Sequence, residues 1–342
     1  MALVYNSTAI RGVAAEPIFE EIFFDNATIA DGLVTFEEDI KAETIFTEGI
    51  ADITLQAYTC GKPTPAGNLN LFDTVVTPVK FLFYDEFCPD TTRFSRFKRD
   101  MAPGAWNTRS SEFERMILQM ISAGISEQVE NLFWNNVTSA TKAGVAGLTA
   151  GTTNAEVSTA EKALVAATPV GTTNAAWDGI VQRMIYNSSN QAQTAGVGAR
   201  IKVAGTTITA ANIKDEYAKV FAAIPAKLLK SRTRQVFIYA PHSHMQLITA
   251  FNNNVANYKD AFVMVNGNFT YNGIEIKFVP LPENVMIAAP KQHLVWNTDL
   301  KSDMNRVEID KVENASDMWF VKVVMTLTTH VANQRYNVLY VG

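Results

Sequence analysis

Two long elements placed one after the other constrain this chain most. An extended hairpin is predicted over residues 50–84, and one long amphipathic helix is predicted over residues 111–136. A two-stranded hairpin has little core of its own, so a long one is usually stabilised by lying on a neighbouring molecule. This order of elements therefore favours a protein that contacts other subunits.

The helix has a clear start and a clear apolar pattern. Ser111 and Glu114 have the spacing of a capping box, in which each side chain satisfies a backbone N–H of the other. Apolar residues and one glycine then recur at intervals of three and four: Phe113, Met116, Ile117, Met120, Ile121, Gly124, Val129, Leu132 and Phe133. The pattern predicts one buried face on a helix about 37 Å long. A core helix of any α/β protein would show the same pattern.

The hairpin is predicted from two apolar runs with a turn region between them. Ile50, Ile53, Leu55 and Tyr58 mark the first strand, and residues 71–83 the second. Gly and Pro punctuate the loop 61–68, and Pro63 and Pro65 stiffen it. We expect inter-subunit contacts at Lys62, Pro63, Pro65 and Asn68. An ordinary core hairpin remains an equally good interpretation of the periodicity.

The remaining chain divides into three further parts. Residues 1–45 mix short apolar clusters with acids and lack a long period, so they read as an arm that needs a partner's surface, with Phe19 and Phe23 as candidate contacts. Alternating helix and strand signals predict an α/β lobe over residues 140–260. Strands follow in residues 261–342, where Asn272-Gly273 predicts a tight hairpin turn.

Composition excludes several classes of protein. Only 18% of the 342 residues are charged, which indicates surface hidden between subunits, and the net charge of −5 gives no global attraction for nucleic acid. Two cysteines, Cys60 and Cys88, make neither a disulfide framework nor a zinc site. Neither a signal peptide nor an apolar run long enough for a membrane span is present, so we expect no membrane partner.

We find no catalytic, cofactor-binding or metal-binding constellation in the sequence. His242 and His244 follow Pro241 at a predicted helix start, where side chains two residues apart diverge. Asp299, Asp303 and Asp310 are too dispersed for a calcium loop. We therefore expect a protein that is not an enzyme and that needs no cofactor.

Two basic patches could contact nucleic acid. The first contains Arg93, Arg96, Lys98 and Arg99 with Phe94 and Phe97 between them, and the second contains Lys227, Lys230, Arg232 and Arg234. Interleaved aromatic and basic residues can bind single strands. Because 34 acids are available, we favour ion pairs with carboxylates of the same or a neighbouring subunit.

With these parts in order, the chain resembles the major capsid proteins of tailed bacteriophages, which have the Hong Kong 97 type fold. The segments that carry the likeness are the arm 1–45, the extended loop 46–85, the helix around 110–134 and the closing strands 271–310. The resemblance implies an α+β fold with a peripheral domain (86–139 and 261–342) and an axial domain (140–260).

The resemblance also implies function and partners. Copies would form hexamers and pentamers of an icosahedral viral shell around double-stranded phage DNA, held by confinement. A portal and decoration proteins would accompany the shell, and the initiator Met1 favours a separate scaffolding protein. The expected location is the virion capsid, and the host cytoplasm during assembly. Some relatives crosslink a loop lysine to an asparagine of a neighbour, but Lys62 has no assignable catalytic acid here.

Three alternatives stay open from the sequence. The same fold builds encapsulin-like cellular compartments. A cytosolic α/β enzyme with an unrecognised site would need acid/base pairs that the sequence does not cluster. A tail tube or adhesin subunit would form rods or fibres instead of shells.

Overall fold

The computed structural model describes residues 8–11, 27–38, 40, 43–58, 60–62, 64–88, 111–170, 177–191, 199–230, 235–254, 261–298, 306–312 and 318–342. The chain divides into two compact units, each assembled from segments far apart in the sequence. Unit 1 comprises Met1–Lys41, Pro78–Leu132 and Trp296–Thr328, and unit 2 comprises Ala42–Thr77, Phe133–Val295 and Thr329–Gly342.

Unit 1 is built on a sheet whose long central strand is β14 (Trp319–Val331). The strands follow the order β1 (Thr8–Arg11), β13 (Arg306–Lys311), β14, β12 (Leu294–Thr298) and β2 (Thr35–Glu37), and β5 (Val79–Phe87) also pairs with β14. Alternate residues of β14 such as Val321, Val323 and Met325 are buried. This alternation is typical of a sheet with one covered face. A single helical turn, α2 (Ala27–Ala30), also lies in this unit.

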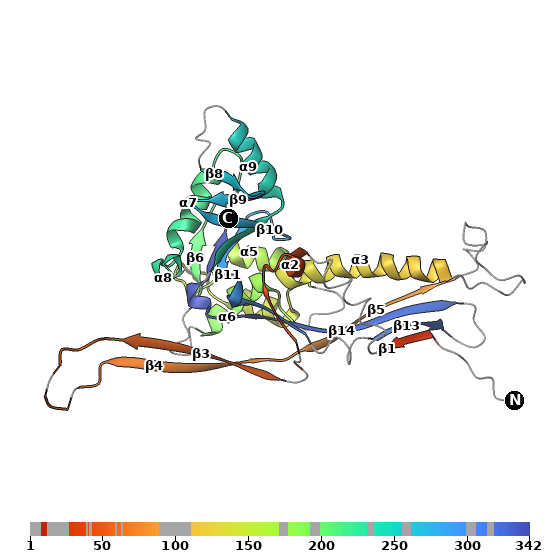
Figure 1. Ribbon diagram of the computed structural model, residues 1–342, viewed down its shortest axis with the longest axis horizontal. Helices are drawn as coiled ribbons and strands as arrows, with labels where there is room; N and C mark the ends of the chain where they lie inside the picture. Colours follow the sequence, from red (N-terminus) through yellow and green to blue (C-terminus); the bar gives the residue numbers. More distant parts are fainter. Residues whose placement is uncertain are drawn as a thin grey trace, which may run out of the picture. The chain divides into compact units, whose positions relative to one another are not determined.

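The long helix is confirmed as α3 (Ser111–Asn135) (Figure 1); its residues up to Leu132 belong to unit 1 and the last three to unit 2. Its buried face agrees with the prediction in part. Val129 and Phe133 are buried as predicted, whereas Met120, predicted to be buried, is 66% exposed. Ser122, Ile125 and Ser126 are buried but were not predicted, because serines add little apolar contrast to the buried face.

Unit 2 contains a mixed seven-stranded sheet with β7 (Val236–Pro241) near its middle. The strand order is β6 (Ile201–Ala204), β15 (Val338–Val341), β11 (Val285–Pro290), β7, β10 (Ile274–Val279), β9 (Asn268–Tyr271) and β8 (Phe262–Val265). β10 runs parallel to β7, and β11 runs antiparallel to it. Every residue of β11 and β15 is buried, as expected of central strands.

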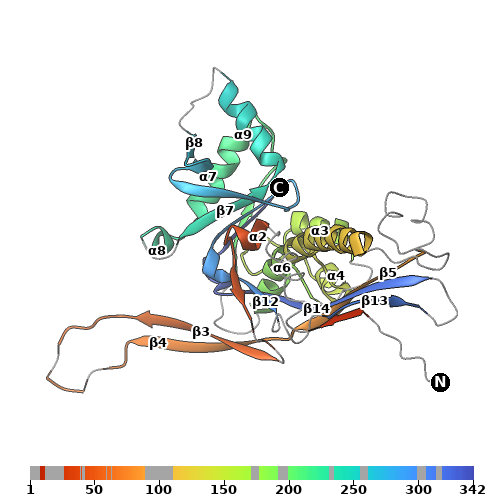
Figure 2. The ribbon, with the colours of Figure 1, turned by 45° about the vertical axis from the view of Figure 1, so that its right-hand side comes forward.

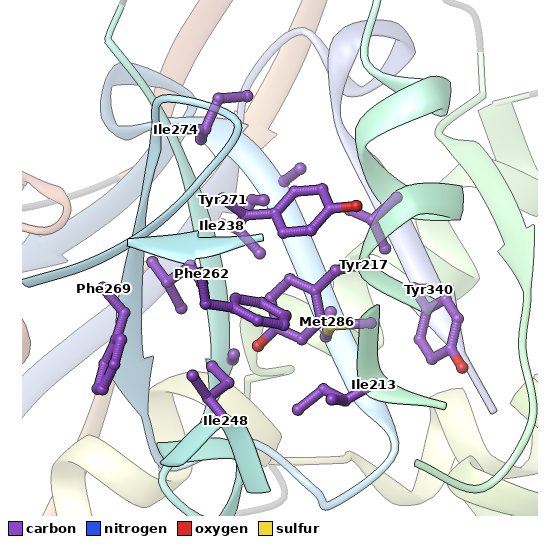
Figure 3. Close-up of a cluster of buried hydrophobic side chains, with 14 of the residues drawn as sticks. Ile213, Tyr217, Ile238, Ile248, Phe262, Phe269, Tyr271, Ile274, Met286 and Tyr340 are labelled. Atoms are coloured by element: carbon purple, nitrogen blue, oxygen red, sulfur yellow. The ribbon is translucent and has the colours of Figure 1, made fainter. Parts of the chain in front are cut away.

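Two helices provide most of the cover for this sheet. α7 (Ile213–Ala223) contacts β6, β11 and β15, and α9 (Ser243–Asn253) contacts β7 (Figure 2). Aromatic side chains fill the core between them, and the ring of Tyr217 meets that of Phe262 edge to face at 5.2 Å (Figure 3). Pro241, predicted to begin the helix, instead ends β7, and α9 starts two residues later.

Three further helices precede the sheet in the chain: α4 (Ser139–Gly147), α5 (Thr159–Ala167) and α6 (Ile180–Gln191). The segments that form α4 and α5 gave no helix prediction of their own, because they are rich in Ala, Gly and Thr. The sequence signal for α4 and α5 lay in the capping residues at their N-termini. The side chain of Thr138 accepts from the N–H of Thr141, and Ser158 forms a capping box with Glu161.

The Asn272-Gly273 turn is confirmed between β9 and β10. Asn272 has φ +48° and Gly273 has φ +80°, the left-handed conformation that such a tight turn requires. A second turn of this kind, Asn266-Gly267 with φ +51° and +85°, joins β8 to β9 and was not predicted.

The extended hairpin consists of β3 (Thr44–Ile53) and β4 (Gly67–Val76), paired antiparallel over ten residues each (Figure 1, orange). The second strand differs from the prediction. It ends at Val76, and β5 begins at Val79 and pairs with β14 in unit 1. Pro78 lacks a backbone N–H, so the ladder stops there and the chain is free to change sheets.

The strands expected in residues 261–342 divide between the two sheets. β8, β9, β10, β11 and β15 join β7 in unit 2, whereas β12, β13 and β14 belong to the sheet of unit 1. Strand pairing between distant segments decides this division, and it leaves no local signal in the sequence. Among the residues that the structure describes, no helix is long and apolar enough to cross a membrane.

Candidate assembly surfaces

The ribbon of β3 and β4 exposes one apolar face. The odd-numbered residues share this face, because side chains alternate along a strand and Ile45 lies opposite Val75. Leu71 is 67% exposed and Ile53 is 75% exposed, and Ile45 and Val75 are also exposed. Apolar side chains that follow one face of a projecting ribbon are typical of a surface that another molecule covers.

A polar pair interrupts this apolar face. The hydroxyl of Thr47 donates a 2.7 Å hydrogen bond to Oδ1 of Asp73 across the ribbon. The two residues are register partners, so the bond fixes the strands relative to each other while leaving the apolar residues on both sides open.

The loop that joins β3 to β4 is exposed and begins earlier than predicted, directly after Ile53. Leu55 is 93% exposed and Tyr58 is 92% exposed, so two large apolar side chains are almost fully exposed to solvent in a single copy. Nε2 of Gln56 donates a 2.6 Å hydrogen bond to the backbone oxygen of Thr64, which holds the two sides of the loop together.

The predicted contact residues occupy different places. Lys62 and Pro65 are exposed in the loop, and Asn68 lies in β4 opposite Asp52. Pro63, Phe19 and Phe23 lie outside the described residues. Sequence reasoning missed Leu55 and Tyr58 as surface residues, because their apolar character had placed them in a strand.

The base of the ribbon is fastened by His330, at the end of β14. The ring of Phe46 stacks on the imidazole with a centroid distance of 4.6 Å and an interplanar angle of 16°. Oε1 of Glu48 lies 3.7 Å from Nε2 of the same ring. Burial alone would raise the pKa of Glu48, but His330, the backbone N–H of Asn333 and the charge of His293 together lower it below its ordinary value. The even-numbered face of β3 is thus the attached face.

Unit 1 has an exposed patch of its own on β5. Leu82 and Tyr84 are about half exposed, and the ring of Tyr84 stacks on that of Phe320 at 5.7 Å. Phe320 neighbours Tyr84 diagonally across the β5–β14 pair. This face of the sheet is therefore a second candidate contact surface.

The histidines considered as metal ligands have structural roles or none. His244 is buried, and its Nδ1 lies 3.1 Å from the hydroxyl of Tyr217 while its Nε2 lies 2.9 Å from the backbone oxygen of Glu283. Burial lowers the pKa of His244, although the Glu283 oxygen opposes this shift. His242 is exposed at the start of α9. No group of His, Cys, Asp and Glu suited to a metal occurs among the described residues.

The structure describes only part of the two predicted basic patches. The first, around Arg96, lies outside the described residues, as do Arg232 and Arg234. The predicted ion pairs of the second patch within the same subunit are absent from the described part of the chain: Nζ of Lys227 lies 3.4 Å from the hydroxyl of Tyr336, and Lys230 is exposed.

The whole chain is similar in structure to subunits of several solved phage and particle capsids. It matches the capsid of the native GTA particle over 100% of its length and 95% of that chain, with a TM-score of 0.54 and 11% identity. It matches a chain of the satellite phage P4 procapsid, which includes the size determination (Sid) protein, over 99% of its own length and 92% of that chain. The TM-score is 0.55 and the identity is 12%. It matches a structure of Mycobacterium phage Bobi over 92% of its own length and 89% of that chain, with a TM-score of 0.52 and 8% identity.

These similarities define the class of fold. The chain has the α+β capsid fold of the Hong Kong 97 type, as the sequence resemblance predicted. No protein-family model and no curated protein matches the sequence. At 8–12% identity, the fold is conserved although few individual residues are.

Proposed function

We propose that this protein is a major capsid protein whose copies form hexamers and pentamers of an icosahedral shell around double-stranded phage DNA. The observation that carries the proposal is that the similarity to capsid subunits extends over the whole chain and over nearly the whole of each matched subunit. The role is structural and not enzymatic.

The surfaces of the subunit support this assignment. The apolar face with Ile45, Leu71 and Val75, together with the loop residues Leu55 and Tyr58, is uncovered in a single copy. A neighbouring copy that covers this face would bury mainly apolar side chains, the usual pattern at the core of an interface, together with Asp73, which is hydrogen-bonded to Thr47. In the loop, Lys62, Pro63, Pro65 and Asn68 would contact that neighbour. Phe19 and Phe23 of the arm would do the same.

We assign the capsid domains by the two sheets. Unit 2, with its seven-stranded sheet, corresponds to the axial domain, and unit 1 to the peripheral domain. The β3–β4 ribbon is the extended loop, and residues 1–45 are the arm. The axial domain then extends beyond residue 260, because β8 to β11 and β15 pair with β7.

Further partners follow from the same proposal. A separate scaffolding protein would direct assembly in the host cytoplasm, and a portal and decoration proteins would complete the virion capsid. The P4 procapsid matched above includes a size determination protein, which supports the general idea of accessory partners. The shell would hold its DNA mainly by confinement, since each subunit carries a net charge of −5.

Light scattering of the purified protein during size-exclusion chromatography tests the proposal. We expect masses of five or six 37.6 kDa chains, or far larger closed particles. A protein that stays monomeric at all concentrations and salt conditions, with scaffolding protein co-expressed, would contradict it.

A further inference from the structure

Two basic residues of unit 2 lie against one aromatic ring, and a third lies on the same helix as one of them. Tyr336 lies in η5 (Gln334–Tyr336), and Cζ of Arg335 is 4.5 Å from the centroid of its ring. Nζ of Lys227, from α8 (Ala226–Leu229), is 5.6 Å from the same centroid. Lys230 caps α8 three residues after Lys227, so the two lysines are neighbours on the helix surface. We call Lys227, Lys230, Arg335 and Tyr336 the Tyr336 cluster.

The positive charges of this cluster have no carboxylate partner among the described residues. Neither lysine nor Arg335 forms an ion pair there, and Nε of Arg335 is buried without an acceptor. Two other lysines of unit 2 have carboxylate partners. Lys219 bonds Glu216 at 2.8 Å and Lys277 bonds Glu275 at 2.8 Å.

This arrangement is electrostatically incomplete. The negative face of an aromatic ring attracts cations, but it does not neutralise them, and like charges held close together repel one another. A buried guanidinium N–H without an acceptor adds a further penalty. An anion at the exposed ends of the lysines would offset the repulsion between these like charges.

Phosphate is the anion that fits this donor set best. Arginine and lysine together are the usual phosphate ligands, because the planar fork fixes geometry and the ammonium adds charge. Four carboxylates of unit 2, Glu48, Glu161, Glu216 and Glu275, each already face a basic partner. An anion from outside the chain can therefore supply the counter-charge.

We propose that the Tyr336 cluster binds phosphodiester groups of nucleic acid, through local contacts without sequence preference. The choice of duplex DNA as the ligand rests on the proposed function. Confinement still holds most of the DNA, and this cluster adds a weak point of attachment on each subunit. Lys227 and Lys230 are exposed, so the backbone of a duplex can reach them from solvent.

The test is the salt dependence of binding to a short fluorescent duplex, measured by anisotropy with the full-length protein. Each neutralised phosphate contributes about 0.9 to the slope of log Kobs against log[salt]. The slope for the double variant K227Q/K230Q should therefore be smaller in magnitude than the wild-type slope by about 1.8. Between 50 and 200 mM salt, the wild type should lose about 12-fold more affinity than this variant.

The matched control is K219Q/K277Q, which removes the same charge from the same unit. Both control lysines have carboxylate partners, and Lys277 also lies over an aromatic ring, that of Phe237 at 5.5 Å. The control should keep the wild-type slope. Equal slopes in all three proteins, or equal losses in both double variants, would overturn the proposal.

A second ligand identifies the class of anion. Polyglutamate should compete poorly with DNA for the wild type. If polyglutamate binds as tightly and K227Q/K230Q abolishes this binding, the cluster takes protein carboxylates and the assignment to nucleic acid is wrong. Shell formation is scored separately by electron microscopy: shells with an unchanged slope would contradict only the cluster, and a reduced slope without assembly would contradict only the capsid function.

Discussion

Glu48 faces His330 across the base of the extended ribbon, with Oε1 3.7 Å from Nε2, and both side chains are largely buried. His330 thereby joins β3 to the end of β14, and the stacked ring of Phe46 covers the same imidazole. On the odd-numbered face of β3 and β4, Ile45, Ile53, Leu71 and Val75 are exposed. The attachment of the ribbon therefore depends on a small polar and aromatic contact.

This contact predicts a pH dependence of stability. The pKa of Glu48 is lowered in the folded protein, so its contribution is present above the ordinary value of 4.5 and is lost as the pH falls through the folded value. We expect E48Q to lower Tm at pH 6 and to reduce the further loss of Tm between pH 6 and pH 3.5. The control is E43Q, an exposed carboxylate just before β3. Parallel Tm curves for E48Q and the wild type would refute the role of Glu48.

The stacking of Phe46 on His330 gives a second prediction. F46A should lower the free energy of unfolding by about 1 kcal/mol, the range of a stacked aromatic pair. It should also make the ribbon more sensitive to limited proteolysis. I45A on the opposite, exposed face should change neither property. Urea unfolding and proteolysis rates measure this difference, and identical results for F46A and I45A would show that the stack is not an anchor.

The apolar face of the ribbon should be needed for assembly and not for folding. I45D/L71D adds two charges to exposed positions, so we expect the Tm of the free subunit to change little. In the shell the same charges would be buried against a neighbour without partners, at several kcal/mol per contact. Sedimentation should show dissociated subunits. Shells of normal stability formed by this variant would exclude the face as an interface.

The loop between the strands can be tested without touching either strand. Replacing residues 54–66 by a Gly/Ser segment of equal length removes Leu55, Tyr58, Lys62 and Pro65 but keeps the β3–β4 register. We expect normal folding by circular dichroism and loss of closed shells in electron micrographs. Normal shells would mean that the exposed loop makes no essential contact.

The buried face of α3 gives a prediction about folding itself. Val129 is 2% exposed, so V129D would place an unpaired carboxylate in the core at a cost comparable to the total stability of a domain. M120D should be mild, because Met120 is 66% exposed. The yield of soluble protein and Tm measure both variants. Equal behaviour would contradict the burial of this helix.

Local signals predicted part of the fold well. The helix α3 and the Asn272-Gly273 turn depend on periodicity, capping and φ angles, which nearby residues determine. The change of sheet at Pro78 was missed, because the pairing of β5 with β14 joins residues more than two hundred positions apart. The exposure of Met120 was also missed, because an apolar stripe in the sequence does not show which of its residues are buried within the subunit.

The loop at 61–68 was expected to contact another subunit, and this stays a prediction. Lys62 and Pro65 are exposed there, as such a contact requires. Leu55 and Tyr58 looked like core strand residues, because an interface uses the same side chains as a core. Lys227 and Lys230 were recognised as part of a basic patch, but their proximity to Tyr336 was not predicted, since Lys227 and Tyr336 are 109 positions apart.

Negative-stain electron microscopy of the purified protein, alone and with its scaffolding partner, tests the central claim most directly. Capsid subunits should give hexameric and pentameric capsomers or closed icosahedral shells, and I45D/L71D should give neither. Single 37.6 kDa particles under every condition, or rods and fibres in place of shells, would contradict the account.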